Sequence, residues 1–211
     1  MPMFPLGTVL FPHALLPLHV FEPRYRLMTQ RVLRGDGEFG VVLIERGSEV
    51  GGGDARFGVG TVARIVRAQE LPDGGYALAT VGLRRIEINE WVSDDPFPQA
   101  AVADLEDIAS DSDRERRTHT VAAFAAVCDL HRSIDPRLPE MPEIHDAPAQ
   151  AAYEIAALAP IGPLDAQRVL EVPATGDRLD LLADLLDDHA RMLRAARPPD
   201  ENERGLDTLS P

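Results

Sequence analysis

Few side chains in this sequence could perform nucleophilic or metal chemistry, and they are scattered along its 211 residues. The six histidines show neither the His-x-x-x-His nor the His-Glu-x-x-His spacing that places two imidazoles on one face of a helix. No serine lies in the Gly-x-Ser-x-Gly turn of a hydrolase. Adjacent carboxylates such as Asp187 and Asp188 point in different directions on a helix. We therefore expect no catalytic residues, no metal site, no cofactor and no enzymatic activity.

All 21 basic residues are arginines, because the sequence contains no lysine. A phosphate-binding loop uses a lysine to reach the terminal phosphates, and Ser–Lys proteolysis requires an amine whose pKa can be lowered. The sequence thus excludes both of these chemistries. Cys128 is the single cysteine, so neither a disulfide framework nor a cysteine-based zinc site can form. This cysteine usage predicts a cytoplasmic protein.

The net charge of -14 is unevenly distributed. Up to residue 92, 10 arginines balance 10 acidic residues, whereas from residue 93 onward 11 arginines face 25 acidic residues. Such acidity disfavours non-specific attraction to nucleic acid or to anionic lipid. The apolar N-terminal stretch is interrupted by prolines, and no segment reaches the roughly 18 apolar residues of a membrane span. We expect neither a signal peptide nor a membrane partner.

The first 110 residues show the patterns of strands and turns with one short helix. The sequence Pro72-Asp73-Gly74-Gly75 favours a tight reversal between two long extended arms. In the second arm the alternation of apolar residues changes phase just after Gly82, which predicts a β-bulge that bends the sheet. Strands are expected at residues 4–11 and 15–21, where prolines indicate sheet edges or bends, and at 39–44, 58–71, 76–92 and 99–105. The helix is expected at 24–34 and a glycine-rich loop at 47–54.

Residues 111–197 show helical periodicity instead. Ser112-Asp113-Arg114-Glu115 matches a capping box, in which a hydroxyl and a carboxylate satisfy free backbone amides at a helix start. The later helices are expected at about 149–159, 164–170 and 176–196, with leucines on one stripe of the last helix. The polar tail, residues 198–211, is expected to be disordered.

Several separated motifs, in this order along the chain, resemble one known family. They are Phe4-Pro5-Leu6-Gly7, the stretch from Leu16 to Arg26, Gly58 to Ile65, Val81 to Ile86 and Asp165 to Glu171. The family is the N-terminal substrate-binding domain of Lon proteases, also found as a stand-alone LON domain, which the Glu22-Pro23-Arg24-Tyr25-Arg26 motif resembles most. The resemblance implies an α+β fold: a small PUA-like β-barrel with one short helix (1–110), followed by a C-terminal α-helical bundle (111–197). It also implies a module that binds protein or peptide segments without cutting them, and that lacks the Lon ATPase and protease modules.

The candidate peptide-binding residues are apolar and lie in or beside the densest of these motifs. Exposed apolar residues near a turn could accept an unfolded segment, although such residues more often belong to a core. The candidates are Phe11, Pro12, Leu16, Phe21 and Tyr25. An apolar groove between barrel and helices would supply the binding energy. Neither the client nor the oligomeric state is predicted.

A second set of residues is assigned a structural role. A polar recognition cluster could be formed by Glu22, Arg24 and Tyr25. We favour the alternative, that these residues fix the first helix to the barrel. Gly82 and Arg85 are also interpreted as structural.

An RNA-binding PUA-like module is the alternative function. Arg64, Arg67, Arg84 and Arg85 fall on the paired arms of the hairpin and could form a basic ridge. The neutral charge of the first half and the absence of stacking aromatics at the centre of either arm argue against RNA. We instead expect ion pairs with Glu70, Glu87 and Glu90, and consider nucleic acid an unlikely partner.

Overall fold

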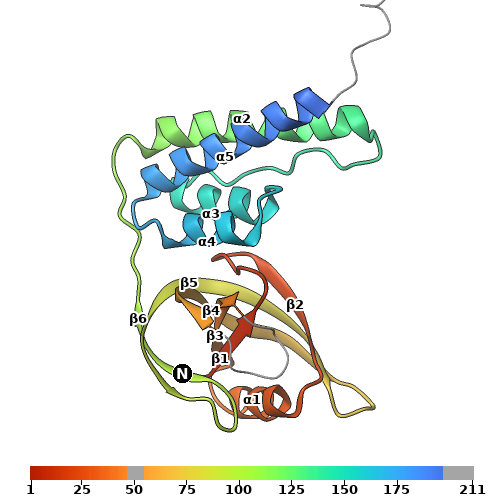
Figure 1. The fold of residues 1–211 in the computed structure, drawn as a ribbon, viewed down its shortest axis with the longest axis vertical. Helices are drawn as coiled ribbons and strands as arrows, with labels where there is room; N and C mark the ends of the chain where they lie inside the picture. The colour runs from red at the N-terminus through yellow and green to blue at the C-terminus, as the bar shows by residue number, and fades with distance from the viewer. Residues whose placement is uncertain (47–54, 197–211) are drawn as a thin grey trace, which may run out of the picture.

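The structure is a computed structural model that describes residues 1–46 and 55–196. The loop expected at 47–54 and the tail expected to be disordered at 198–211 lie outside the described residues. One half of the molecule is a sheet with a single helix, and four further helices form the other half (Figure 1). The elements are β1 (Met3–Leu6), β2 (Leu15–Val20), α1 (Pro23–Leu33), β3 (Glu38–Arg46), β4 (Ala55–Glu70), β5 (Tyr76–Ser93), β6 (Gln99–Asp104), α2 (Asp113–Ile134), α3 (Pro148–Leu158), α4 (Pro163–Glu171) and α5 (Thr175–Ala196).

The six-stranded sheet has the order β1-β3-β4-β5-β2, with β6 also paired to β5. Strands β1 and β3 are parallel, and the other pairs are antiparallel. Proline cannot donate a ladder hydrogen bond, so it suits the end strands. Pro5 in β1 and Pro17 in β2 occupy these ends, as the sequence predicted.

The α+β class is confirmed, whereas the closed barrel is not, because the strand ladders do not form a ring. One reason lies in β5, whose 18 residues pair with β2 over the first part and with β6 over the second. The sheet therefore divides at β5 into two parts, one ending in β2 and the other in β6. Strand β6 meets the start of the chain around the Pro2–Gln99 bridge, where the Met3 amide donates to the Pro98 carbonyl (2.8 Å) and the Ala100 amide donates to the Met1 carbonyl (3.1 Å).

The long hairpin and its bulge form where the sequence predicts them. Gly74 has a φ of +78°, a conformation that glycine adopts without strain, and its amide donates to the Leu71 carbonyl (2.9 Å). Further along β5, Leu83 is the extra residue, because Val62 pairs with Arg84 while Ala63 pairs with Gly82. In the first part of β5 the buried residues are Tyr76, Leu78, Thr80 and Gly82, while the alternate residues Ala77, Ala79 and Val81 are exposed or half-buried.

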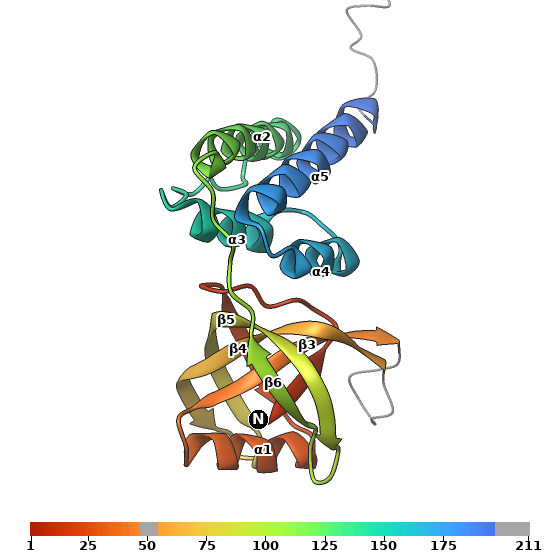
Figure 2. The ribbon, with the colours of Figure 1, turned by 90° about the vertical axis from the view of Figure 1, so that its left-hand side faces the viewer.

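The helical half is built around α5, on which Leu179, Leu182 and Leu186 are fully buried on the predicted stripe. Helices α2 and α5 run in the same direction, and α3 and α4 lie between this pair and the sheet (Figures 1 and 2). The helical core also contains Phe11, which the sheet half contributes.

The start of α2 corrects the capping-box prediction. Ser112 occupies the cap position, but its side chain makes no capping hydrogen bond. Instead, the Asp113 carboxylate accepts hydrogen bonds from the amide (2.8 Å) and the hydroxyl (2.7 Å) of Ser110. The helix begins where predicted. Its first turn is closed by the Asp113 carboxylate and not by the Ser112 hydroxyl, and a carboxylate is the stronger acceptor of hydrogen bonds.

Candidate functional site

A groove separates the sheet half from the helical half. One wall is the segment from Thr8 to Leu16, and the other is formed by the end of α3 and the start of α4. Its volume is about 250 Å³. Its lining is Thr8, Val9, Leu10, Phe11, Ala14, Leu15, Leu16, Ala156, Ala157, Ala159, Ile161, Pro163 and Ala166. No charged side chain is in this lining, and its exposed surface combines polar and apolar atoms, so the groove can hold apolar side chains beside groups that form hydrogen bonds.

The two walls differ in the size of their side chains. The helical wall presents four small side chains, those of Ala156, Ala157, Ala159 and Ala166. The opposite wall presents large ones, and Leu15 exposes 75% of its surface. Alanines leave room that a large apolar side chain of a partner can fill. The groove is therefore shaped to take up bulky apolar groups.

The structure brings only part of the predicted peptide-binding set to this groove. Phe11 and Leu16 line it, while Phe11 is itself buried. Pro12 is also buried, and with Phe11 it lies against Gly82: a Cβ at Gly82 would meet the Phe11 carbonyl oxygen at 2.1 Å and the Pro12 Cα at 3.2 Å. This close approach explains why glycine is required at residue 82.

Phe21 and Tyr25 lie elsewhere, beside or in α1, at the end of the sheet remote from α3 and α4 (Figure 1). Tyr25 is buried, with its ring centroid 4.2 Å from that of Phe4. Phe21 is half-exposed, and its ring lies 6.1 Å from that of His19. These two residues therefore cannot contact a ligand held in the groove.

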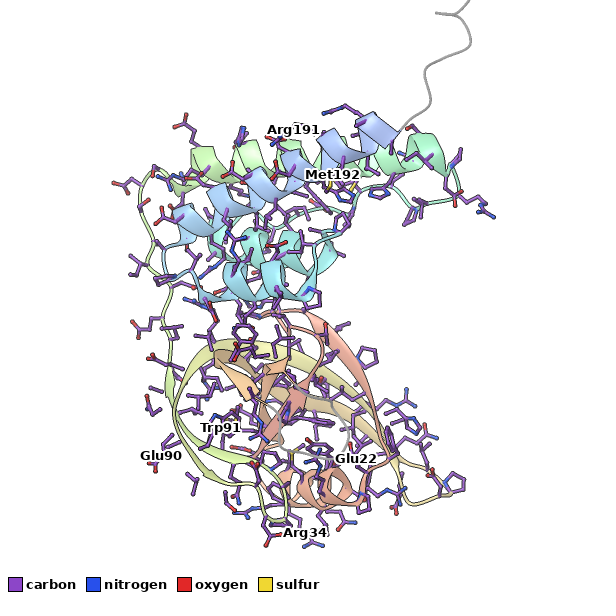
Figure 3. The ribbon with its side chains drawn as sticks, in the orientation of Figure 1. Glu22, Arg34, Glu90, Trp91, Arg191 and Met192 are labelled. Carbon is purple, nitrogen blue, oxygen red and sulfur yellow. The ribbon has the colours of Figure 1, made fainter. Side chains whose placement is uncertain are left out.

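Glu22 and Arg24 interact with each other at the start of α1. The Arg24 Nε donates to Glu22 Oε2 (3.1 Å), and the Arg24 guanidinium lies 4.5 Å from the centre of the Tyr25 ring. Figure 3 labels Glu22 at this end of the molecule. Both charges are engaged within the segment itself, which favours the role of fixing α1 over that of recognition.

A buried polar cluster joins the two halves behind the groove. Asp107, in the segment between β6 and α2, accepts hydrogen bonds from Tyr153 of α3 (2.6 Å), Arg178 of α5 (2.7 Å) and Arg85 of β5 (2.8 Å). Arg85 and Arg178 are almost completely buried. Because its members come from both halves, this cluster fixes the position of α3 relative to the sheet and thereby the width of the groove.

The cluster contains two cations and one anion, and backbone carbonyls compensate for the difference. Arg85 donates to the carbonyls of Leu170 (2.8 Å) and Val172 (3.1 Å), at the C-terminal end of α4. The helix dipole and the free carbonyls at this end both stabilise a cation. Arg178 adds a bond to the Val172 carbonyl (2.6 Å) and stacks on the Tyr153 ring at 4.4 Å.

Proton affinities in the cluster follow from these contacts. Burial by itself would raise the pKa of Asp107, but the Tyr153 hydrogen bond and the charges of Arg178 and Arg85 outweigh burial and lower it. The pKa of Tyr153 is raised, mainly by burial and also by its hydrogen bond to Asp107. Asp107 is thus held ionised and Tyr153 protonated, which is the arrangement that the hydrogen bonds require.

Three of the four hairpin arginines pair with acidic residues, as we expected, and do not form the basic ridge that RNA binding would need. Arg64 and Arg84 both pair with Glu38 (2.5 and 3.1 Å), and Arg84 also pairs with Asp104 (2.9 Å). Arg85 is buried in the cluster described above. The pairing itself agrees with the structural interpretation, but the partners are Glu38, Asp104 and Asp107 in place of Glu70, Glu87 and Glu90.

Sequence reasoning missed three residues that position the site: Asp107, Tyr153 and Gln167. The Gln167 side chain donates to the Val59 carbonyl (3.1 Å) and so ties α4 to β4. A signal was present for Gln167, because it lies in the Asp165 to Glu171 motif that carries the family resemblance. Asp107 and Tyr153 lie in no such motif.

Two further properties constrain the site. No group of three or more His, Cys, Asp or Glu residues within 1–46 and 55–196 is arranged to hold a metal ion. None of the helices in these ranges combines the length and the apolarity needed to cross a bilayer.

The model of the ATP-dependent protease La (LON) substrate-binding domain matches residues 1–188. This chain belongs to that family. The match confirms the resemblance seen in the motifs, and it includes both walls of the groove and the whole of the buried cluster. The LON domain here therefore comprises the sheet half together with most of the helical half.

Curated relatives and solved structures agree with this assignment. The chain is 29% identical over 203 residues to a Lon protease of Cytophaga hutchinsonii and 28% identical over 202 residues to that of Escherichia coli. Each alignment covers 93% of this chain but only 25% and 26% of the relative, so the chain spans about a quarter of their length.

The fold is similar to a Lon N-terminal domain protein from Xanthomonas campestris (TM-score 0.62, 24% identity, 94% of this chain and 98% of that chain). It is also similar to the N-terminal domain of Mycobacterium avium complex Lon protease (TM-score 0.68, 19% identity, 89% and 98%).

Proposed function

We propose that this LON domain binds unfolded or flexible protein segments through their bulky apolar side chains, in the groove between the sheet and α3–α4, without changing them covalently. The observation that carries the proposal is the uncharged, alanine-walled groove, held at a fixed width by the Asp107 cluster. We place this activity in the cytoplasm, because the sequence has a single cysteine and no disulfide framework.

The energetics suit weak binding that tolerates many sequences. Burying one large apolar side chain contributes about 1.5–3 kcal/mol. A groove of about 250 Å³ holds few such side chains, so the segment as a whole has to supply further contacts. Recognition by apolar volume alone discriminates poorly between side chains of similar size, because one methylene contributes only about 0.8 kcal/mol. The family, whose model describes a substrate-binding domain, supports the same activity.

The experiment compares two equally simple substitutions. Leu15→Ser removes an exposed side chain in the groove, and Leu27→Ser removes one on α1, remote from the groove; the two leucines are 75% and 49% exposed. Binding of a fluorescent, permanently unfolded protein and of labelled apolar peptides is measured by anisotropy. We expect Leu15→Ser to raise Kd about tenfold or more, which is the loss of one buried leucine, while Leu27→Ser leaves Kd unchanged.

Filling the groove provides an independent variant. Ala157 is exposed in the groove, and Ala157→Trp would occupy the space of a partner's side chain without disturbing the core. Structured RNA serves as a second ligand, for which we expect no saturable binding. An equal effect of Leu15→Ser and Leu27→Ser, or the absence of saturable binding to any polypeptide, would refute the proposal.

A further inference from the structure

A pair of histidines joins the C-terminal part of α2 to that of α5, and neither histidine lines the groove. The Nε2 atoms of His131 and His189 are 3.0 Å apart, and the pair is partly buried. The ring centroids are 5.2 Å apart and the ring planes differ by 19°. Because the centroids are much farther apart than the nitrogens, the two rings meet end to end. Figure 3 labels Arg191 and Met192 on the following turn of α5.

This geometry is that of a hydrogen bond between two imidazoles. One Nε2 must carry a proton and donate, and the other must be unprotonated and accept. A metal ion held between two nitrogens in this end-to-end arrangement would need them about 4 Å apart, since each metal–nitrogen bond is about 2 Å. The pair therefore retains its hydrogen bond only while at least one imidazole is neutral.

The charged groups around the pair are already engaged with one another. On α2 and the segment after it, Arg132 lies 3.8 Å from Glu140, and Asp135 pairs with Arg137 (2.8 Å). On α5, Asp188 pairs with Arg191. None of these three carboxylates is paired with His131 or His189 in the structure. When the second imidazole is protonated, none of them therefore compensates its positive charge by an ion pair.

His131 also borders a second cavity, of about 310 Å³, in the helical half. This cavity is open to solvent and lies between α2, the loop before α3 and the end of α3. Its lining is Phe124, Val127, Cys128, His131, Arg132, Leu138, Pro139, Glu140, Met141, Pro142, Leu158 and Pro160. Because α2 supplies one wall, a movement of α2 at His131 changes the packing around this cavity.

We propose that His131 and His189 form a pH-sensitive latch that holds the C-terminal parts of α2 and α5 together at neutral pH and opens on acidification. When both imidazoles are protonated, both nitrogens become donors, the hydrogen bond is lost and two positive charges face each other. The helices then separate locally and loosen the packing around Cys128, which lines the cavity beside His131. The proposal needs no ligand and is independent of the peptide-binding function.

The expected direction follows from the environment of His189. Burial, and then the charge of His131, lower the pKa of His189 below its ordinary value. A histidine whose pKa is lower in the folded than in the unfolded chain contributes stability that is fully present above the unfolded value, about 6.5. That stability is lost as the pH falls from there toward the folded value. In this interval the unfolding equilibrium constant rises by up to about tenfold per pH unit.

The first test measures urea unfolding at pH 7.5 and 5.5 for the wild type, His131→Gln, His189→Gln and the matched control His119→Gln, which changes an exposed histidine on α2. Glutamine can still donate and accept a hydrogen bond but does not titrate. We expect the acid-induced loss of stability to be smaller in both latch variants and unchanged in the control. Equal pH dependence in all four proteins would overturn the proposal.

The second test uses the wild type alone, so it holds even where a variant fails to fold. NMR of the imidazole nitrogens should show His189 taking up its proton at lower pH in the folded than in the urea-unfolded chain. The reaction of Cys128, the single thiol of the chain, with a disulfide reagent active at low pH should accelerate on acidification relative to the urea-unfolded chain. Protonation of His189 at the same pH in the folded and the unfolded chain, or an unchanged relative labelling rate, would refute the latch.

Discussion

Replacing Asp107 by asparagine should destabilise the protein by about 2–3 kcal/mol. Asparagine keeps the shape of the side chain but removes the only anion that the structure shows bound to both Arg85 and Arg178. Removing one charge from a buried ion pair costs about 3–5 kcal/mol. The Asp107 side chain is 27% exposed, and both arginines keep bonds to backbone carbonyls, so screening brings the expected cost to the lower limit of that range or below it.

Urea unfolding followed by circular dichroism measures this change. Asp165→Asn is the matched control, because Asp165 pairs with Arg168 (2.9 Å) at an exposed position on α4, where such a pair contributes about 0–0.5 kcal/mol. Tyr153→Phe removes only the hydroxyl that donates to Asp107, which should cost about 1 kcal/mol. The double variant should be less destabilised than the sum of the two single variants. If Asp107→Asn costs no more than Asp165→Asn, the reasoning that the cluster holds the two halves together is refuted.

Two further predictions concern the same framework. Gly82→Ala should destabilise the protein by about 2 kcal/mol or more, because the added Cβ would lie 2.1 Å from the Phe11 carbonyl oxygen and would displace the wall of the groove. Thermal unfolding and the Kd for the peptide measure the two effects. The control is Gly58→Ala, whose Cβ meets nothing within 4 Å. The contribution of Asp107 should also disappear in strong acid: its pKa is lowered in the folded state, so its stabilisation is present above the unfolded value of about 3.9 and is lost as the pH falls below it. The difference in unfolding free energy between wild type and Asp107→Asn should shrink over that interval, and a difference independent of pH would contradict the assignment.

Local patterns in the sequence were sufficient to predict most elements. The turn at Gly74, the bulge near Gly82, the proline-containing end strands and the leucine stripe of α5 all depend on residues close together in the chain. Whether the sheet closes into a barrel was not predictable in the same way, because the division of β5 between two partner strands depends on contacts between distant segments. The capping box was wrong because the Ser112 side chain makes no capping hydrogen bond, and the first turn is closed instead by Asp113, which accepts from Ser110.

The candidate site was predicted only in part for the same reason. Phe11 and Leu16 are in the groove, but the neighbouring α1 carries Tyr25 to the other end of the sheet. The alanines of the helical wall follow no distinctive sequence pattern. A small side chain indicates a binding site only when the residues across the groove are known. Asp107 and Arg178 are 71 residues apart, and His131 and His189 are 58 apart, so sequence spacing gave no signal for either pair.

The burial of Phe11 among the helices bears on how the molecule melts. This ring is supplied by the sheet half yet belongs to the helical core, where its centroid lies 6.3 Å from that of Tyr153. A fragment that ended at residue 110 would leave the ring in water, and the isolated helices would contain a hole in its place. Heat or urea should therefore disrupt strands and helices in one cooperative transition, with far-ultraviolet and aromatic signals changing together.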